Sequence, residues 1–241
     1  MLFSILEGGS ISDAIILLLL TLPMIALALS AHEAAHGWVA YKCGDSTAYL
    51  AGRLTLNPLR HLDPLGFLFM LVFGYGWAKP VPINTRNFRN PKNGMAISAA
   101  AGPGANLILG VFCAFITGVL EAVYVYLKCI SAKVFLIGCV WWLKYMLYFG
   151  ALINFVFMLF NLIPVPPFDG SRIALVVLPP KFYFKVMRYE RQIMIGLLIT
   201  MLLLSRLFSF SPFNWLAKKL VDLIVVPVGN LTWMLLKTRL P

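Results

Sequence analysis

The sequence predicts an all-α integral membrane protein with about five transmembrane helices (four to six), a re-entrant segment and a short β-strand or hairpin. Of the 241 residues, 61% are hydrophobic and 12% are charged, whereas about 25% are charged in an ordinary soluble domain. The apolar residues form runs long enough to cross a bilayer. Lys and Arg gather between these runs, as the positive-inside rule describes.

The first predicted span is a helix over residues 14–41. Ser12 precedes it as a candidate N-cap, and Pro23 predicts a kink within it. Its 28 residues extend about 42 Å at 1.5 Å per residue, which exceeds the roughly 30 Å of bilayer hydrocarbon. The last turns of this helix are therefore expected in the interface.

The next segments predict irregular structure. Residues 42–63 are rich in turn signals such as Asn57-Pro58. Residues 65–77 are apolar but too few for a helical crossing, which favours a re-entrant or interfacial segment. In residues 79–84, prolines alternate with Val81 and Ile83. That pattern favours an edge strand, although a simple interfacial turn fits the same residues.

Four more apolar stretches predict the remaining helices, at residues 94–127, 134–160, 192–207 and 213–236. The last of them fits either a crossing or a helix lying partly in the interface. Lys144 is expected to snorkel outward near one end of its span. We interpret residues 1–241 as a single membrane-embedded domain with C-terminal helices at about 190–237.

The distribution of charge predicts the orientation. Residues 42–92 hold seven Lys or Arg against two Asp, so this loop is expected in the cytoplasm and the N-terminus outside. The basic loop 181–191 is expected inside and the link 128–133 outside. Lys237 and Arg239 place the C-terminus inside if the last stretch crosses the membrane.

The net charge of +11 does not indicate nucleic-acid binding, because the basic residues lie between spans and not on one recognition face. We expect membrane lipids as partners and no nucleic acid. Residues 1–13 lack Lys and Arg, so they do not resemble a secretory signal. The cysteines show no CxxC spacing, which excludes a zinc finger, and pairing of Cys129 with Cys139 stays open.

The residues with the clearest chemical meaning are His32-Glu33-Ala34-Ala35-His36. Histidines at positions i and i+4 share one helix face, so both imidazoles can reach one metal ion, with Glu33 placed as a base. Two buried histidines with ordinary hydrogen bonds are the alternative. A run of apolar residues precedes the motif, and ionisable groups inside a membrane helix are costly and usually functional.

A catalytic zinc ion usually has three protein ligands, and the chain offers few candidates for the third. His61 and Asp63 follow the motif closely, whereas Asp169 lies far away in Asn161-Leu-Ile-Pro-Val-Pro-Pro-Phe-Asp169-Gly170. The prolines predict irregular backbone, which is tolerated at membrane depth where it lines a cavity. Asp169 fits a metal ligand, and it also fits an N-cap for a short helix.

Four segments together resemble the site-2 protease family of intramembrane zinc metalloproteases: HEAAH at 32–36, GRLTLNPLRHLDPLG at 52–66, GPGAN at 102–106 and NLIPVPPFDG at 161–170. They cover the core from about residue 20 to 180. The resemblance implies a Zn2+ ion held by His32, His36 and Asp169, with Glu33 as the catalytic base. It also implies that Asn161 lies near the active site and that an edge near Val81 and Ile83 holds unwound substrate.

Within this resemblance, two roles stay open. Asn161 fits an oxyanion hydrogen bond and equally a structural bond to backbone freed by the prolines. The small residues of GPGAN predict close packing on the metal-bearing helix, with Asn106 in a packing role.

The resemblance implies an endopeptidase that hydrolyses transmembrane or signal-peptide-like substrates within or near the bilayer. Its active site is expected nearer the cytoplasmic side of a prokaryotic plasma membrane. One alternative is a prenyl-peptide protease whose ligands include His61. Another is an inactive relative acting as a binding partner, a chaperone or a transporter. The sequence does not indicate the substrate or the oligomeric state.

Overall fold

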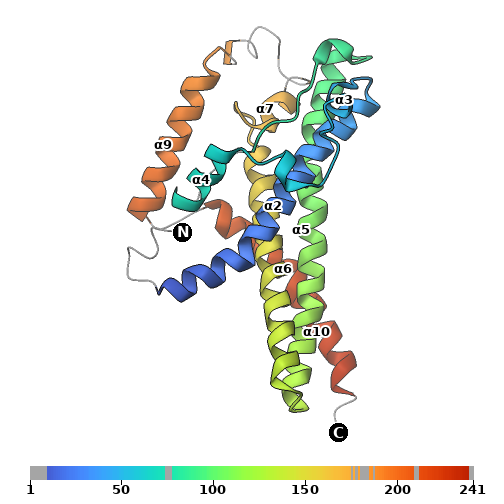
Figure 1. Cartoon of the computed structure of the whole chain (residues 1–241), viewed down its shortest axis with the longest axis vertical. Coiled ribbons are helices and arrows are strands. Elements are labelled where there is room, and N and C mark those ends of the chain that lie inside the picture. Colours follow the sequence, from blue (N-terminus) through green and yellow to red (C-terminus); the bar gives the residue numbers. More distant parts are fainter. Residues whose placement is uncertain are drawn as a thin grey trace.

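The computed structural model describes residues 10–73, 78–174, 176, 179, 185–186, 188–208 and 212–238. These residues form a helical bundle (Figure 1). The helices are α2 (Ile11–Lys42), α3 (Thr47–Leu50), α4 (Pro64–Phe73), α5 (Pro91–Cys129), α6 (Val134–Asn161), α7 (Asp169–Ala174), α9 (Glu190–Phe208) and α10 (Pro212–Lys237). Two 3-10 turns, η1 (Pro58–Arg60) and η2 (Thr85–Asn87), lie in the loop between α2 and α5.

Four of the described helices, α2, α5, α6 and α10, are long and apolar enough to cross a membrane. The sequence predicts about five. The predicted span at 192–207 forms α9, which is not among the four. The crossing of the membrane by α9 therefore stays a prediction. Figure 1 shows α9 lying apart from the other long helices.

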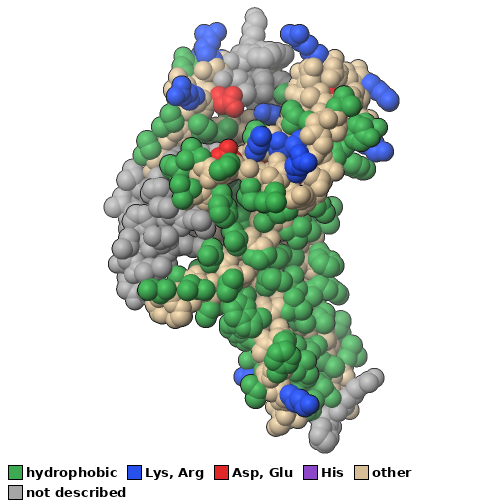
Figure 2. Space-filling model, in the orientation of Figure 1, with side chains coloured by type: hydrophobic (Ala, Val, Ile, Leu, Met, Phe, Trp, Pro, Cys, Tyr) green, Lys and Arg blue, Asp and Glu red, His purple; other side chains and the backbone are tan. Residues whose placement is uncertain are grey.

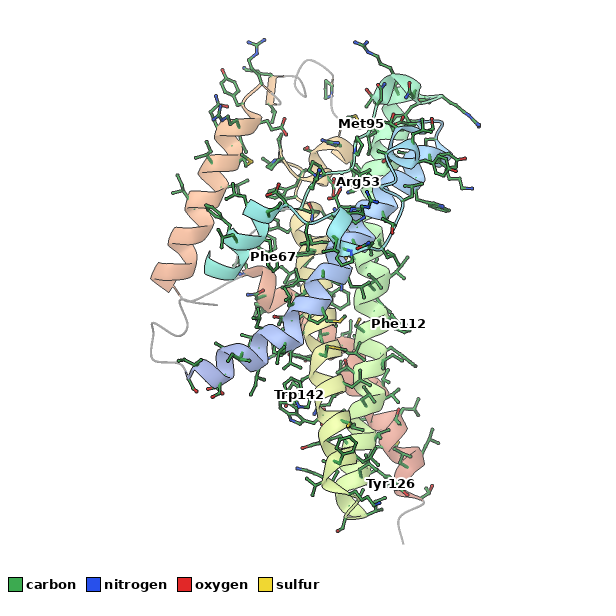
Figure 3. The ribbon with its side chains drawn as sticks, in the orientation of Figure 1. Arg53, Phe67, Met95, Phe112, Tyr126 and Trp142 are labelled. Carbon is green, nitrogen blue, oxygen red and sulfur yellow. The ribbon has the colours of Figure 1, made fainter. Side chains whose placement is uncertain are left out.

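The expected β-strand does not form in the part of the chain that the structure describes. Residues 79–84 have no ladder partner, and the β-pairing found there is an isolated antiparallel bridge between Leu62 and Ala78. Pro80 and Pro82 have no N–H to donate, which removes alternate donors from any ladder. The buried Arg53 holds this segment instead, because its guanidinium donates to the Lys79 carbonyl at 2.6 Å (Figure 3).

The predicted re-entrant stretch forms α4, a helix of 10 residues. Asp63 caps its start, since the Gly66 N–H donates to Asp63 Oδ1 at 2.8 Å. At about 15 Å, α4 is too short to cross a bilayer, and residues 74–77 lie outside the described part. Its re-entrant placement in lipid stays a prediction.

The bundle is held by α5, which packs against α2, α6 and α10. Glycines allow the close approaches: a Cβ at Gly150 would lie 2.3 Å from Met24 Cε, and one at Gly118 would lie 2.8 Å from the Val225 carbonyl oxygen. The core between the helices includes Cys113 and Phe155. Outside it, apolar side chains such as Phe112 point away from the bundle (Figures 2 and 3). Such a surface is suited to lipid and not to water.

One expectation about the charged residues is wrong. Lys144 does not snorkel outward: it is buried, its Nζ lies 2.9 Å from Glu121 Oε2, and it lies over the rings of Tyr124 and Tyr145.

The C-terminal end of α10 lies beside the α5–α6 connection (Figure 1), so it is at the opposite end of the bundle from the 42–92 loop. The side of the membrane on which each end lies stays a prediction.

The four cysteines, Cys129 and Cys139 among them, are free in the structure.

A buried carboxylate, Asp45, joins the loop after α2 to the segment before α5. It accepts hydrogen bonds from the backbone and hydroxyl of Thr47, from the Asn84 N–H at 2.7 Å and from Asn87 Nδ2 at 2.9 Å. Its side chain is fully buried. Burial alone raises the pKa of the Asp45 carboxyl, but the hydrogen bonds from Thr47, Asn87 and Asn84 outweigh it, so the pKa lies below its ordinary 3.8.

Replacing Asp45 by Asn should destabilise the protein by about 2–3 kcal/mol, because several buried donors lose a charged acceptor. Because the pKa of Asp45 is lowered by folding, its contribution to the free energy of unfolding is present above about pH 4. That contribution is lost as the pH falls through the pKa of Asp45 in the folded protein. Thermal unfolding in detergent at pH 7 and at lower pH measures the difference. Asp63→Asn is the control, since Asp63 bonds within its own turn. Equal unfolding temperatures for Asp45→Asn and wild type would contradict the assignment.

Candidate metal centre

The first two residues of the candidate site lie one helical turn apart on α2. His32 and His36 are both buried. Their rings meet edge to face with centroids 4.6 Å apart, and their Nε2 atoms are separated by 3.0 Å. The i, i+4 spacing on one helix face gives this geometry directly.

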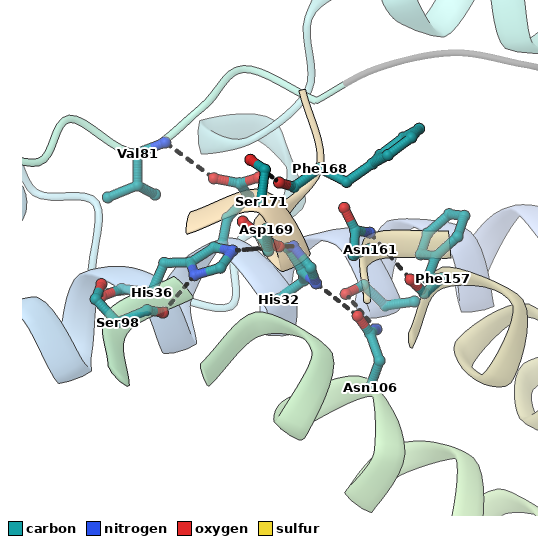
Figure 4. Close-up of polar contacts among 12 residues, drawn as sticks. His32, His36, Val81, Ser98, Asn106, Phe157, Asn161, Phe168, Asp169 and Ser171 are labelled. Atoms are coloured by element: carbon teal, nitrogen blue, oxygen red, sulfur yellow. Dashed lines mark hydrogen bonds and ion pairs between the residues drawn. The ribbon is translucent and has the colours of Figure 1, made fainter. Parts of the chain in front are cut away.

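Asp169 reaches the same point from the other end of the chain. A turn after α6 reverses the chain, and Asp169 is the first residue of α7. Its Oδ2 lies 3.1 Å from His32 Nε2 and 3.2 Å from His36 Nε2 (Figure 4). Gly170 permits the tight turn, because a Cβ there would lie 2.4 Å from the carbonyl oxygens of Leu162 and Ile163.

The imidazoles are oriented from behind by α5. His36 Nδ1 lies 2.7 Å from the Ser98 carbonyl oxygen, and His32 Nδ1 lies 2.6 Å from Asn106 Oδ1. A carbonyl oxygen accepts only, so each Nδ1 carries the proton and donates. In the neutral form of each ring, Nε2 therefore presents a lone pair toward Asp169.

The residues present fit a zinc ion. Three acceptor atoms, two Nε2 and Asp169 Oδ2, lie 3.0–3.2 Å from one another, and Oδ2 is buried with no hydrogen bond. Ligand atoms at about 2.0–2.1 Å from a tetrahedral zinc ion are about 3.3–3.4 Å apart. Acceptors held this closely need a cation among them. Among the described residues, His32, His36 and Asp169 are the group that meets a metal-site geometry.

The electrostatics of Asp169 also indicate a site for positive charge. Burial alone raises the pKa of the Asp169 carboxyl, but a protonated imidazole facing it outweighs burial through its N–H and its charge, and holds the pKa below its usual range. A metal ion in the same position would act on the carboxylate in the same direction.

Glu33 lies beside this triad at the edge of a cavity of about 240 Å³. Its Oε2 accepts a hydrogen bond from the Val81 N–H at 2.9 Å. The segment that was expected to form a strand thus lies over the site and fixes the carboxylate. The other residues predicted for the site, Val81, Ile83 and Asn161, line the same cavity, as does Arg172, which the sequence analysis did not identify.

Asn161 and His61 have defined partners. Asn161 Nδ2 donates to the Phe157 carbonyl at 3.0 Å, within its own helix, so both of its predicted roles stay predictions. His61 is buried in the loop, where its Nε2 lies 2.7 Å from the Thr55 carbonyl oxygen. His61 is not part of the metal-ligand group, so the alternative third ligand is not supported.

Some residues that support the site could not be identified from the sequence. Ser98 acts through its backbone carbonyl, which no residue type can signal. Gly102 was assigned to helix packing, but a Cβ there would lie 2.4 Å from His36 Nε2 and 2.6 Å from His32 Cε1. Because residue 102 has no side chain, the imidazole rings of His32 and His36 can both lie against α5 at this position.

Comparison with known proteins agrees with this geometry. Residues 20–204 match the peptidase family M50, which is more than half of the chain. The chain belongs to peptidase family M50. This confirms the resemblance to site-2 proteases and supports a multi-pass membrane metalloprotease.

A curated relative is the Bacillus subtilis (strain 168) protein named "Putative zinc metalloprotease YwhC". It is 39% identical over 167 residues, which cover 69% of this chain and 72% of the relative. No solved structure matches the chain significantly. The family match does not favour the transporter or binding-partner alternatives.

Proposed function

We propose that this M50 family member is an intramembrane zinc endopeptidase that cleaves transmembrane or signal-peptide-like substrates. The observation that carries the proposal is the convergence of His32 Nε2, His36 Nε2 and Asp169 Oδ2 within 3.0–3.2 Å of one another. They come from helices far apart in the sequence and meet beside Glu33 in a cavity.

The proposed mechanism assigns a role to each of these side chains. His32, His36 and Asp169 would hold zinc, which when bound would polarise the scissile carbonyl and make water a nucleophile at neutral pH. Glu33 takes a proton from the attacking water and delivers it to the leaving amine nitrogen. The Val81 N–H keeps the Glu33 carboxylate in one orientation between these two transfers.

The substrate segment is expected to enter the cavity unwound, because a helical peptide bond is shielded by its own hydrogen bonds and side chains. We place the unwound segment along Val81 and Ile83, which line the cavity and belong to a stretch without ladder partners. A peptide strand can add to such an edge. Asn161, at the opposite wall, is available to contact the substrate carbonyl.

The site lies nearer one end of the bundle. His36 packs on α5 at Ser98 and Gly102, about 16 Å from the start of that helix and about 40 Å from its far end. The near end carries the basic 42–92 loop, so we propose that the site opens toward the cytoplasm. The 39% identity to a Bacillus subtilis protein supports a prokaryotic plasma membrane as the location, and we treat the whole of 1–241 as one catalytic domain.

Metal removal tests the proposed function. Purified protein in lipid vesicles should cleave a reporter transmembrane peptide, lose cleavage on treatment with a zinc chelator, and regain it when zinc is restored. Product masses locate the cut site. Cleavage that persists after complete metal removal, verified by elemental analysis, would contradict the proposal.

A further inference from the structure

The two histidines are oriented in different ways. His36 Nδ1 donates to a backbone carbonyl, that of Ser98, which no side-chain substitution removes. His32 Nδ1 donates to a side chain, Asn106 Oδ1, at 2.6 Å. The orientation of His32 therefore depends on what holds the Asn106 amide.

The Asn106 amide is itself held from two other helices. Asn106 is fully buried on α5, and its Nδ2 donates to the Ala28 carbonyl on α2 at 3.3 Å and to Asn154 Oδ1 on α6 at 2.8 Å. Asn154 is also fully buried, and its Nδ2 donates to the Gly150 carbonyl at 2.8 Å. Each amide thus uses its oxygen and its nitrogen in different bonds.

The direction of every bond in this chain is fixed by its last member. The Gly150 carbonyl can only accept, so Asn154 must turn its Nδ2 toward Gly150 and its Oδ1 toward Asn106. Asn106 must then turn its Nδ2 toward Asn154 and present Oδ1 to His32. That oxygen requires the proton on Nδ1, so the neutral His32 ring, which is the form that binds a metal, has its Nε2 lone pair facing Asp169.

We propose that Asn106 and Asn154 are positioning residues that together select the tautomer and ring orientation of His32 for metal binding. This inference rests on the proposed zinc site. A histidine ligand commonly donates its second ring N–H to an oriented acceptor, and losing that acceptor typically weakens metal affinity by about 10–100-fold. Here the acceptor is oriented by a second asparagine on a different helix.

The test is the zinc dissociation constant of purified, metal-free protein, measured by chelator competition in detergent at pH 7. Asn106→Ala and Asn106→Leu should each weaken zinc binding by about 10–100-fold. Asn154→Ala and Asn154→Leu should weaken it by about 3–10-fold, since Asn106 keeps its bond to Ala28. Ala and Leu differ in volume, but both remove the same hydrogen bonds. Similar losses of zinc affinity from the two substitutions would therefore indicate lost orientation of His32, and different losses would indicate altered packing.

A double-mutant cycle tests whether Asn154 acts through Asn106. In the Asn106→Ala background, Asn154→Ala should cause no further loss of zinc affinity, whereas independent packing effects would multiply. Thr117→Val is the matched control: Thr117 is a buried polar residue of α5 whose hydroxyl donates within its own helix, to the Cys113 carbonyl. Its zinc dissociation constant should stay within about twofold of wild type.

The possible results separate this inference from the proposed function. Wild-type protein that binds no zinc would overturn the proposed function and this inference with it. If Asn106→Ala binds zinc as tightly as wild type, this inference alone is overturned. If the losses of zinc affinity from the two single variants multiply in the double variant, the role of Asn154 is overturned. Circular dichroism reports folding, and failure of all the asparagine variants to fold would assign both residues to stability and overturn the inference.

Discussion

Glu33→Gln should reduce cleavage of a reporter transmembrane substrate by about 10²–10⁴-fold while the protein still inserts, folds and binds zinc. A carboxamide cannot take a proton from water at neutral pH, and general acid–base catalysis contributes about this factor. The amide keeps an oxygen for the Val81 N–H that Glu33 now binds, so the local structure should survive. Single-turnover cleavage in lipid vesicles, with zinc content measured on the same sample, gives both values.

The matched control is Glu190→Gln, the same change at the start of α9 and outside the cavity. It should leave the cleavage rate unchanged. If Glu33→Gln cleaves at the wild-type rate with zinc bound, Glu33 is not the base.

Gly102→Ala should weaken zinc binding by about 100-fold or more and reduce cleavage at least as strongly. The added Cβ would lie 2.4 Å from His36 Nε2 and 2.6 Å from His32 Cε1. Both rings are tethered to α5 at Nδ1, so they cannot move away without breaking a bond that orients a ligand. Displacement of a reacting group by about 1 Å can alone cost about 10²-fold in rate. Chelator competition and cleavage assays measure the two effects.

Gly104→Ala, two residues further along the same helix and motif, is the control. A Cβ there meets no other atom within 4 Å, so zinc affinity and cleavage should match wild type. If the two variants behave alike, the close approach at Gly102 does not matter to the site.

The sequence predicted that His32 and His36 would meet, because their approach is encoded in their spacing. The i, i+4 histidines need only a helix to meet, and the helix follows from a long apolar run. Asp169 is harder, because 133 residues separate it from His36. Its position depends on how α6 packs and how the chain turns at Gly170. The resemblance to a known family supplied that link, and spacing alone did not.

The missed features depend on tertiary contacts. A proline-containing stretch alternating with Val81 and Ile83 looks like a strand, but no partner strand lies beside it among the described residues. The sequence around Lys144 predicts a snorkelling side chain, because it does not show that α5 places Glu121 Oε2 2.9 Å from Lys144 Nζ. Asn154 has no sequence neighbour that reveals its role, because its partner Asn106 lies 48 residues away on another helix.

The central claim is that His32, His36 and Asp169 form the metal site. Zinc content per chain in wild type, Asp169→Ala and His61→Ala, purified without chelators, tests it most directly. We expect about one zinc ion per chain in wild type and in His61→Ala, and little or none in Asp169→Ala, because two histidines alone do not make a stable zinc site. Full zinc content in Asp169→Ala, with loss of zinc in His61→Ala, would contradict the account.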